Sequence, residues 1–147
     1  MPDRPVDVGA VWKFIRRHRL AVVSTVAPGR KPEAAAVLFA ATPRGELVFD
    51  TLVTSRKYQN LRRNPAIAVV IGWDKLVTVQ MEGVADEPRG AELRRLKREY
   101  FRRFPDGRER ERQAGTTYVR VRPTWARYSD FNRPGTIVEL DLPAKRR

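Results

Sequence analysis

The chain of 147 residues contains no cysteine and only one histidine, His18. The absence of cysteine excludes disulfide bonds, zinc–thiolate sites and thiol nucleophiles. A single imidazole cannot supply a multi-histidine metal site, so we expect no metal. Because His18 stands among arginines at the predicted end of a helix, we expect a solvated side chain rather than a catalytic one.

Long apolar runs are also absent from the sequence. No stretch approaches the roughly 20 apolar residues of a membrane-spanning helix, and the first ten residues lack the apolar segment of a signal peptide. We therefore expect a cytoplasmic protein without a membrane partner. The length fits one domain with a real core, residues 1–147, and we expect loose arms at 1–6 and 141–147.

Acidic residues are scarce, with 17 Asp and Glu against 30 Lys and Arg, which gives a net charge of +13. Such an excess favours anionic partners: a nucleic acid, an anionic surface or a phosphorylated small molecule. The segment 89–112 is rich in arginine, and we expect much of the positive surface there, including Arg94, Arg95 and Arg98.

The hydrophobic pattern predicts many short strands and few helices. Asp7 is a good cap for a helix over 8–17, a second helix is expected at 56–63, and a third runs from about 88 to the Pro105–Gly107 turn, followed by a charged loop. We predict strands at 20–26, 33–41, 47–51, 66–71, 76–86 and 116–128, with a last strand at 136–140.

Three of these strands carry finer expectations. The apolar run 66–71 predicts a strand that is buried on both faces. Gly83 marks a bulge or bend, and Pro123 is expected to break the strand that contains it. Because short turns join most strands, the sequence predicts a mainly β, six-stranded antiparallel barrel with flanking helices.

The stretch from Leu47 to Pro65 combines a strand, a turn and a short basic helix. Thr54 and Ser55 are both good helix caps, yet Arg56 and Lys57 follow in the first turn, where the helix dipole disfavours cations by some tenths of a kcal/mol. Two cations beside free N–H groups and hydroxyls suit a bound phosphate. The alternative is an ordinary surface helix with scattered basic residues.

This stretch resembles the pyridoxamine 5′-phosphate oxidase-like family of flavin-binding split β-barrels. The residues that carry the resemblance are Asp50-Thr51, Ser55-Arg56-Lys57, Asn60-Leu61 and Asn64-Pro65, and the similarity extends over roughly 8–130. The resemblance implies a six-stranded antiparallel split β-barrel. It also implies a homodimer with flavin at the interface.

The resemblance further implies a set of cofactor-binding residues. Arg56 and Lys57 would hold the flavin phosphate, with Ser55 and Thr51 nearby, and the strand from Ala36 to Phe39 would offer backbone groups to the ring. Gln80 would approach the ring edge or reach it from the neighbouring subunit; alternatively it is a solvent-facing strand residue. The full set is Val37, Leu38, Phe39, Asp50, Thr51, Ser55, Arg56, Lys57, Asn60 and Gln80.

Two departures from the family pattern bear on activity. True pyridoxamine phosphate oxidases carry an Arg-x-His element near the C-terminus that grips the substrate, and no histidine follows Arg112. Related members often place a tryptophan in the closing strand where this chain has Ser129, while Trp125 is out of register and suits packing. These departures argue against true pyridoxamine phosphate oxidase activity.

The leading hypothesis is an FMN-dependent oxidoreductase acting on a small molecule, because flavin carries the redox chemistry itself and one phosphate matches one Arg-Lys helix start. No catalytic residue is assigned. The deazaflavin F420 is an alternative on the same fold. A nucleic-acid-binding module is a second alternative, although the basic helix lacks the interleaved aromatics of single-strand binders. A flavin carrier or stress protein without turnover is a third.

Overall fold

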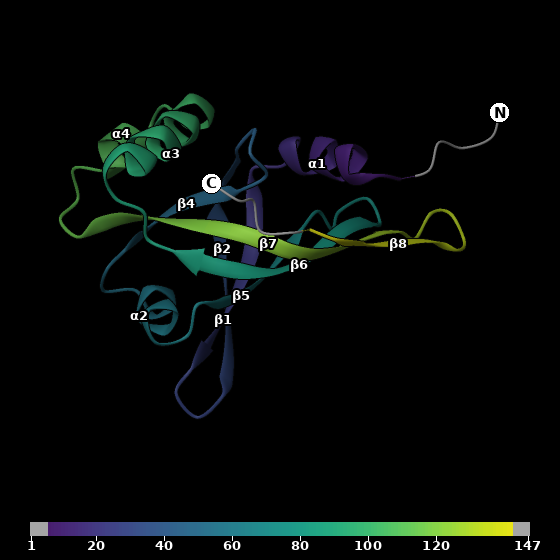
Figure 1. The fold of residues 1–147 in the computed structure, drawn as a ribbon, viewed down its shortest axis with the longest axis horizontal. Coiled ribbons are helices and arrows are strands. Elements are labelled where there is room, and N and C mark those ends of the chain that lie inside the picture. Colours follow the sequence, from purple (N-terminus) through teal and green to yellow (C-terminus); the bar gives the residue numbers. More distant parts are fainter. Residues whose placement is uncertain (1–5, 143–147) are drawn as a thin grey trace.

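The computed structural model describes residues 6–142, which form one curled antiparallel sheet with helices on both sides (Figure 1). The sheet has the strand order β2-β1-β5-β6-β7-β4-β3, and β8 pairs with β7. Its strands are β1 (Leu20–Ala27), β2 (Lys31–Leu38), β3 (Ala40–Ala41), β4 (Leu47–Leu52), β5 (Ala66–Ile71), β6 (Val77–Asp86), β7 (Thr116–Asp130) and β8 (Thr136–Asp141).

The predicted split-barrel class is confirmed, but the strand count is eight rather than six. The six expected strands correspond to β1, β2, β4, β5, β6 and β7. The expected last strand is β8, and the two-residue β3 separates from β2 at Phe39, whose N–H donates to the Arg19 carbonyl at 2.9 Å. Of the expected arms, residues 1–5 and 143–147 lie outside the described residues, whereas Asp141 belongs to β8 and Leu142 is buried.

The helices are α1 (Val8–Arg16), α2 (Arg56–Arg63), α3 (Gly90–Arg103) and α4 (Gly107–Arg110). In Figure 1, α1, α3 and α4 lie on one side of the β6–β7 pair and α2 lies on the other. Asp7 caps α1 as predicted, because its carboxylate accepts from the Ala10 N–H at 2.9 Å. The charged segment after Pro105, expected to be a loop, begins with the short helix α4. No helix within 6–142 is long and apolar enough to cross a membrane.

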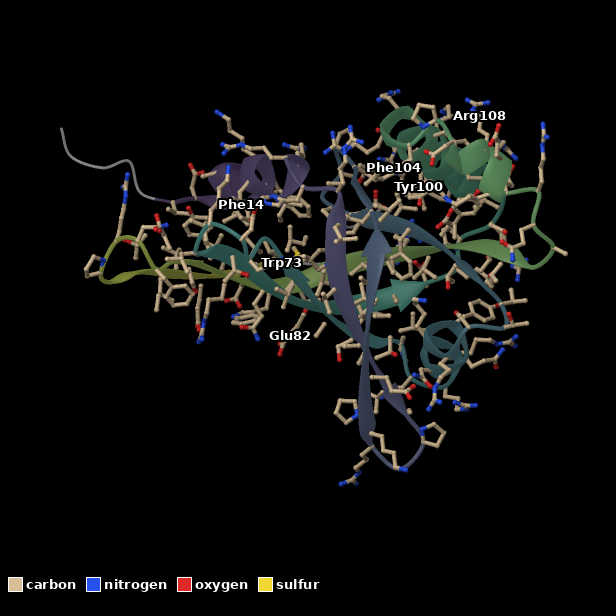
Figure 2. The ribbon with its side chains drawn as sticks, turned by 180° about the vertical axis from the view of Figure 1, so that it is seen from behind. Phe14, Trp73, Glu82, Tyr100, Phe104 and Arg108 are labelled. Atoms are coloured by element: carbon tan, nitrogen blue, oxygen red, sulfur yellow. The ribbon has the colours of Figure 1, made fainter. Side chains whose placement is uncertain are left out.

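Two groups of buried side chains stabilise the fold. The larger fills the inside of the curled sheet, where Val11 and Ile15 of α1 pack against residues such as Phe49 and Met81. The smaller lies under α3, where Tyr100 and Phe104 point toward the sheet (Figure 2) and pack with Tyr118. Every apolar side chain of these groups removes surface from water, worth about 25 cal/mol per Å².

The strand that contains Pro123 is not broken, contrary to the sequence-based prediction. β7 runs as one strand over 15 residues, but it carries an extra residue beside the proline: Glu82 of β6 pairs with Trp125 and Gly83 with Pro123, so Thr124 is the inserted residue. A Cβ on Gly83 would lie 2.6 Å from the Arg122 carbonyl oxygen, so a side chain would not fit. The bulge predicted at Gly83 is therefore confirmed, and it accommodates the proline without ending the strand.

The expectation that 66–71 is buried on both faces is wrong for the single chain. Ile67, Val69 and Ile71 point into the core, whereas Val70 on the opposite face is 36% exposed. Val70 pairs with Val22 of β1, and Leu20 and Leu38 are also exposed on these neighbouring strands. The outer surface of β2, β1 and β5 is therefore apolar, and no other described part of the chain covers it.

Candidate functional site

The helix α2 begins and ends where its local signals predicted. The Ser55 hydroxyl accepts from the Tyr58 N–H at 3.2 Å, which caps the first turn. The Thr51 hydroxyl lies 2.9 Å from the Ser55 hydroxyl, so the end of β4 and the start of α2 are joined by side chains. Asn64, which precedes Pro65, ends the helix in extended backbone.

A pocket of about 410 Å³ lies between the N-terminus of α2, the strand β4 and the strand β2. We call it the seam pocket, because β2 is the last strand of the sheet and approaches β4 without pairing with it. Its lining residues are Ala36, Val37, Leu38, Asp50, Thr51, Leu52, Thr54, Ser55, Lys57 and Arg110. Six of the ten residues predicted from the family resemblance are among them.

The seam pocket offers three kinds of polar group. Lys57 supplies an ammonium group that makes no ion pair with any residue between 6 and 142. Thr51 and Ser55 supply hydroxyls. The free edge of β2 supplies backbone N–H and C=O groups, because no strand within residues 6–142 pairs with it on the side away from β1.

Arg56 does not line the seam pocket. Its guanidinium forms an ion pair with Glu33 on β2, and its side chain is 83% exposed. A neighbouring hollow of about 290 Å³, lined by both Arg56 and Lys57, lies on the β1 side of the same helix end. Lys57 therefore lines both hollows, whereas Arg56 lines only the one on the β1 side.

Asn60 is also directed away from the seam pocket. Only 3% of its surface is exposed, and its side-chain amide donates to the Thr25 hydroxyl at 3.0 Å and to Glu33 at 2.8 Å. The hydrogen bonds from Asn60 and Arg56 lower the pKa of Glu33, which keeps it a carboxylate. Through these contacts Asn60 fixes α2 against the β1–β2 hairpin.

Gln80 and Phe39 lie apart from the seam pocket. Gln80 is exposed on the outer face of β6, between Val70 and Arg127 in the register of the sheet. Phe39 is 1% exposed and belongs to the main core. Neither residue contacts the seam pocket within one chain.

Arg110 of α4 lines the seam pocket, and sequence reasoning missed it. Its guanidinium donates to Asp50 at 3.2 Å, to Asp106 at 2.7 Å and to the Tyr100 hydroxyl at 3.1 Å. Burial and the nearby Asp50 carboxylate raise the pKa of Tyr100 to about 12, so its phenol stays neutral. These contacts attach α4 to β4 and complete one wall of the pocket.

A separate group of charged and polar residues lies at the other end of β4, and we call it the Glu46 cluster: Thr42, Glu46, Asp86, Glu92, Arg95 and Arg120. Glu46 accepts from Arg95 at 2.8 and 2.9 Å and from Thr42 at 2.7 Å. Burial alone would raise the pKa of Glu46, but the hydrogen bonds from Arg95 and Thr42 lower it to about 2. The expectation that Arg95 contributes to the positive surface is therefore wrong, whereas Arg94 and Arg98 are exposed.

His18 is less solvated than expected. Its imidazole is half-buried, its Nδ1 lies 2.9 Å from the Phe14 carbonyl oxygen, and its ring centroid lies 4.5 Å from that of Phe14. The arginines around it remain at the surface. The helix end therefore shields one face of the imidazole.

Comparison with protein-family models decides the relationship. The model described as pyridoxamine 5′-phosphate oxidase matches residues 9–130, which is well over half of the chain. The chain belongs to the pyridoxamine 5′-phosphate oxidase-like family. The comparison with curated protein sequences gave no match.

Solved structures support the same fold. A heme-binding protein from Mycobacterium smegmatis is similar with a TM-score of 0.77 and 17% identity over 89% of this chain, which spans 57% of that protein. A conserved hypothetical protein from Mycobacterium tuberculosis has a TM-score of 0.72 and 23% identity, covering 94% of this chain and 95% of the other. General Stress Protein 26 from Bacillus anthracis has a TM-score of 0.69 and 20% identity, covering 90% and 95%.

In this member of the pyridoxamine 5′-phosphate oxidase-like family, the sequence motif predicted several residues that line the seam pocket, but it did not predict Arg110. Asp50, Thr51, Ser55 and Lys57 are close in sequence and were predicted together. Arg110 lies 60 positions from its partner Asp50, within a run of alternating charges that gives no sign of which arginine turns inward.

Proposed function

We propose that this protein is an FMN-binding oxidoreductase that acts on a small molecule, with the cofactor phosphate in the seam pocket. One observation carries the proposal: the unpaired ammonium of Lys57 and the hydroxyls of Thr51 and Ser55 line a single pocket at the N-terminus of α2. The proposal agrees with the family membership and with most of the residues that the family motif implies.

The lining residues fit a phosphorylated, planar cofactor. The volume of about 410 Å³ lies within the range of small-molecule sites, about 300–1,000 Å³. Lys57 and the positive end of the helix dipole favour a phosphate, and the Ser55 and Thr51 hydroxyls are donors beside it. Arg56 is a second phosphate ligand in this proposal, and it must first leave Glu33.

The remaining walls suit orientation of the ring. When bound, a flavin supplies the hydride or electron transfer, while the chain's own residues bind and orient it. The free edge of β2 at Ala36, Val37 and Leu38 offers backbone hydrogen bonds to a planar polar ring. Arg110, held by Asp50 and Tyr100, forms a positive wall on the opposite side. Asn60 acts by holding α2 in place.

We further propose a homodimer in which the partner completes the site. The apolar outer surface of β2, β1 and β5, with Leu20, Leu38 and Val70 exposed, favours a second copy over water. Leu38 also lines the seam pocket, so a partner on this surface would reach the pocket. Gln80, exposed on β6 beside Val70, then belongs to the contribution of the neighbouring subunit.

Titration with FMN and riboflavin tests the phosphate assignment. Lys57→Ala should weaken FMN binding by about 10- to 100-fold, because a charge-assisted hydrogen bond contributes roughly 1.5–3 kcal/mol. Arg56→Ala should have a smaller effect, because its pair with Glu33 must be broken before it binds phosphate. Arg63→Ala, at the other end of the same helix, is the matched control and should leave FMN affinity unchanged.

Riboflavin, which lacks the phosphate, should bind weakly to the unmodified protein and be nearly indifferent to Lys57→Ala. Equal losses of FMN and riboflavin affinity would overturn the assignment of Lys57. The absorption spectrum of the purified protein separates the competing cofactors: FMN gives a yellow protein, and a colourless protein that binds added F420 instead would favour the deazaflavin.

A further inference from the structure

A further pocket lies beside α3, and we call it the α1–α3 pocket. It has a volume of about 300 Å³ and lies between the end of α1, the strand β3 and the last turns of α3. Its polar lining residues are Arg16, His18, Glu99, Arg102 and Arg103, and it shares no residue with the seam pocket. Figure 1 shows α1 and α3 on the same side of the sheet, away from α2.

The charge of the α1–α3 pocket is strongly positive. Three arginines face one glutamate, and Glu99 is paired with Arg102 at 3.2 Å. Arg16 and Arg103 make no ion pair with any residue from 6 to 142. The only hydrogen bond of Arg103 in that range is its long contact of 3.4 Å with the His18 carbonyl oxygen. Two guanidinium groups at this pocket are therefore available for an anion.

The floor of the α1–α3 pocket is apolar. It is formed by Phe39, which is 1% exposed, and by the two alanines of β3. At its edge stands the imidazole of His18. Since the Phe14 carbonyl can only accept, the His18 Nδ1 at 2.9 Å carries a proton, and Nε2 is the remaining polar atom of the ring.

We propose that the α1–α3 pocket binds a small organic phosphate monoester. A guanidinium fork matches the oxygens of a phosphate, and two unpaired guanidinium groups balance the two negative charges of a monoester. The apolar floor receives the organic part of the ligand. The volume is at the lower end of the range for small-molecule sites, about 300–1,000 Å³, so the ligand is small. The long, flat backbone of a nucleic acid matches a concave pocket of this size poorly.

Phenyl phosphate is the probe, and the single histidine is the reporter. Because His18 is the only histidine in the chain, its imidazole NMR signals are unambiguous. Titration should shift them saturably, and phenol at the same concentrations should not. Arg16→Gln or Arg103→Gln should weaken phenyl phosphate binding by about 10-fold or more, as expected for a lost charge-assisted hydrogen bond.

Two controls keep this site distinct from the seam pocket and from general charge attraction. Lys57→Ala should leave phenyl phosphate affinity at the α1–α3 pocket within twofold, whatever its effect on FMN. Arg94→Gln removes an exposed arginine of the same helix outside the pocket and should also have less than a twofold effect. Arg103→Lys retains the charge without the fork, and it should bind more weakly than the unmodified protein while keeping the same melting temperature.

The absence of a saturable shift of the His18 signals with millimolar phenyl phosphate would overturn the proposal. An equal loss of phenyl phosphate affinity in Arg94→Gln and Arg103→Gln would also overturn it, because binding would then depend on the overall positive charge rather than on this pocket. A random-sequence DNA duplex that shifts the same signals at lower concentration than phenyl phosphate would also overturn it, in favour of a nucleic-acid surface.

Discussion

The Glu46 cluster and the Asp50–Arg110 pair stand at opposite ends of β4 and are built from the same residue types. In the cluster, Glu46 is 5% exposed and Arg120 is 5% exposed, and both are surrounded by partners. The Asp50–Arg110 pair instead lines an open pocket of about 410 Å³. Burial, rather than residue type, separates an ion pair enclosed in the fold from one that lines a pocket.

Removing one member of the buried cluster should have the largest effect on stability. Arg120→Ala leaves the buried Glu46 with one cation fewer and Asp86 without its closest partner, at 2.6 Å. We expect the free energy of unfolding to fall by about 3–5 kcal/mol, measured by urea denaturation. Arg122→Ala, two positions along β7 and 3.7 Å from the same Asp86, is the control and should cost less than about 1 kcal/mol. Equal losses of unfolding free energy in the two variants would show that the buried position of Arg120 adds nothing to its ion pairs.

The stability of the protein should depend on pH through Glu46 of the same cluster. The pKa of Glu46 is lower in the folded protein, about 2, than its ordinary value of 4.5. Its contribution is therefore complete above pH 4.5 and is lost as the pH falls through the folded pKa. The shift of the Glu46 pKa corresponds to a contribution to the free energy of unfolding on the order of 3 kcal/mol.

Urea denaturation at a series of pH values tests this contribution. Between pH 4.5 and 2, the unfolding free energy of Glu46→Gln should fall less steeply than that of the unmodified protein. Identical slopes for the two proteins would mean that Glu46 does not carry the acid sensitivity.

Lys57→Ala should have the smallest effect on stability, although it should have a large effect on cofactor affinity. The ammonium of Lys57 makes no ion pair between 6 and 142 and lies in the first turn of α2, where a cation is unfavourable by some tenths of a kcal/mol. We expect the melting temperature of the ligand-free protein to stay the same or rise slightly. A clear fall would mean that Lys57 stabilises the fold, as the cluster arginines do.

The parts of the fold that follow from local signals could be predicted from the sequence. The cap at Ser55 and the proline at position 65 fix the bounds of α2, and the family motif brings Lys57 and Thr51 to one pocket. Gly83 marked its bulge because a side chain would collide with the Arg122 carbonyl. Each of these features depends on residues close to one another in the sequence, or on a close approach of two backbones that only glycine permits.

The parts that depend on distant partners could not be predicted. Arg94 and Arg95 are neighbours of identical type, yet only Arg95 meets Glu46, 49 positions away. The apolar run of β5 indicated two buried faces, but its outer face is uncovered within one chain, since apolarity alone does not tell whether a face meets the core or a partner. Pro123 is tolerated because its own strand bulges at the next residue, Thr124, opposite Gly83 of β6.

The unpaired seam between β2 and β4 has a consequence for kinetics. No ladder hydrogen bonds join these two strands, so widening the space between them breaks none of the backbone bonds that hold the sheet together. For the cofactor proposed in the seam pocket, we therefore expect the barrier to exchange to be set by local contacts, such as Arg110 with Asp50, rather than by the barrier to unfolding. A barrel closed all round would tie ligand release to loss of its sheet, whereas the unpaired seam would let the lifetime of the proposed complex differ from the lifetime of the fold.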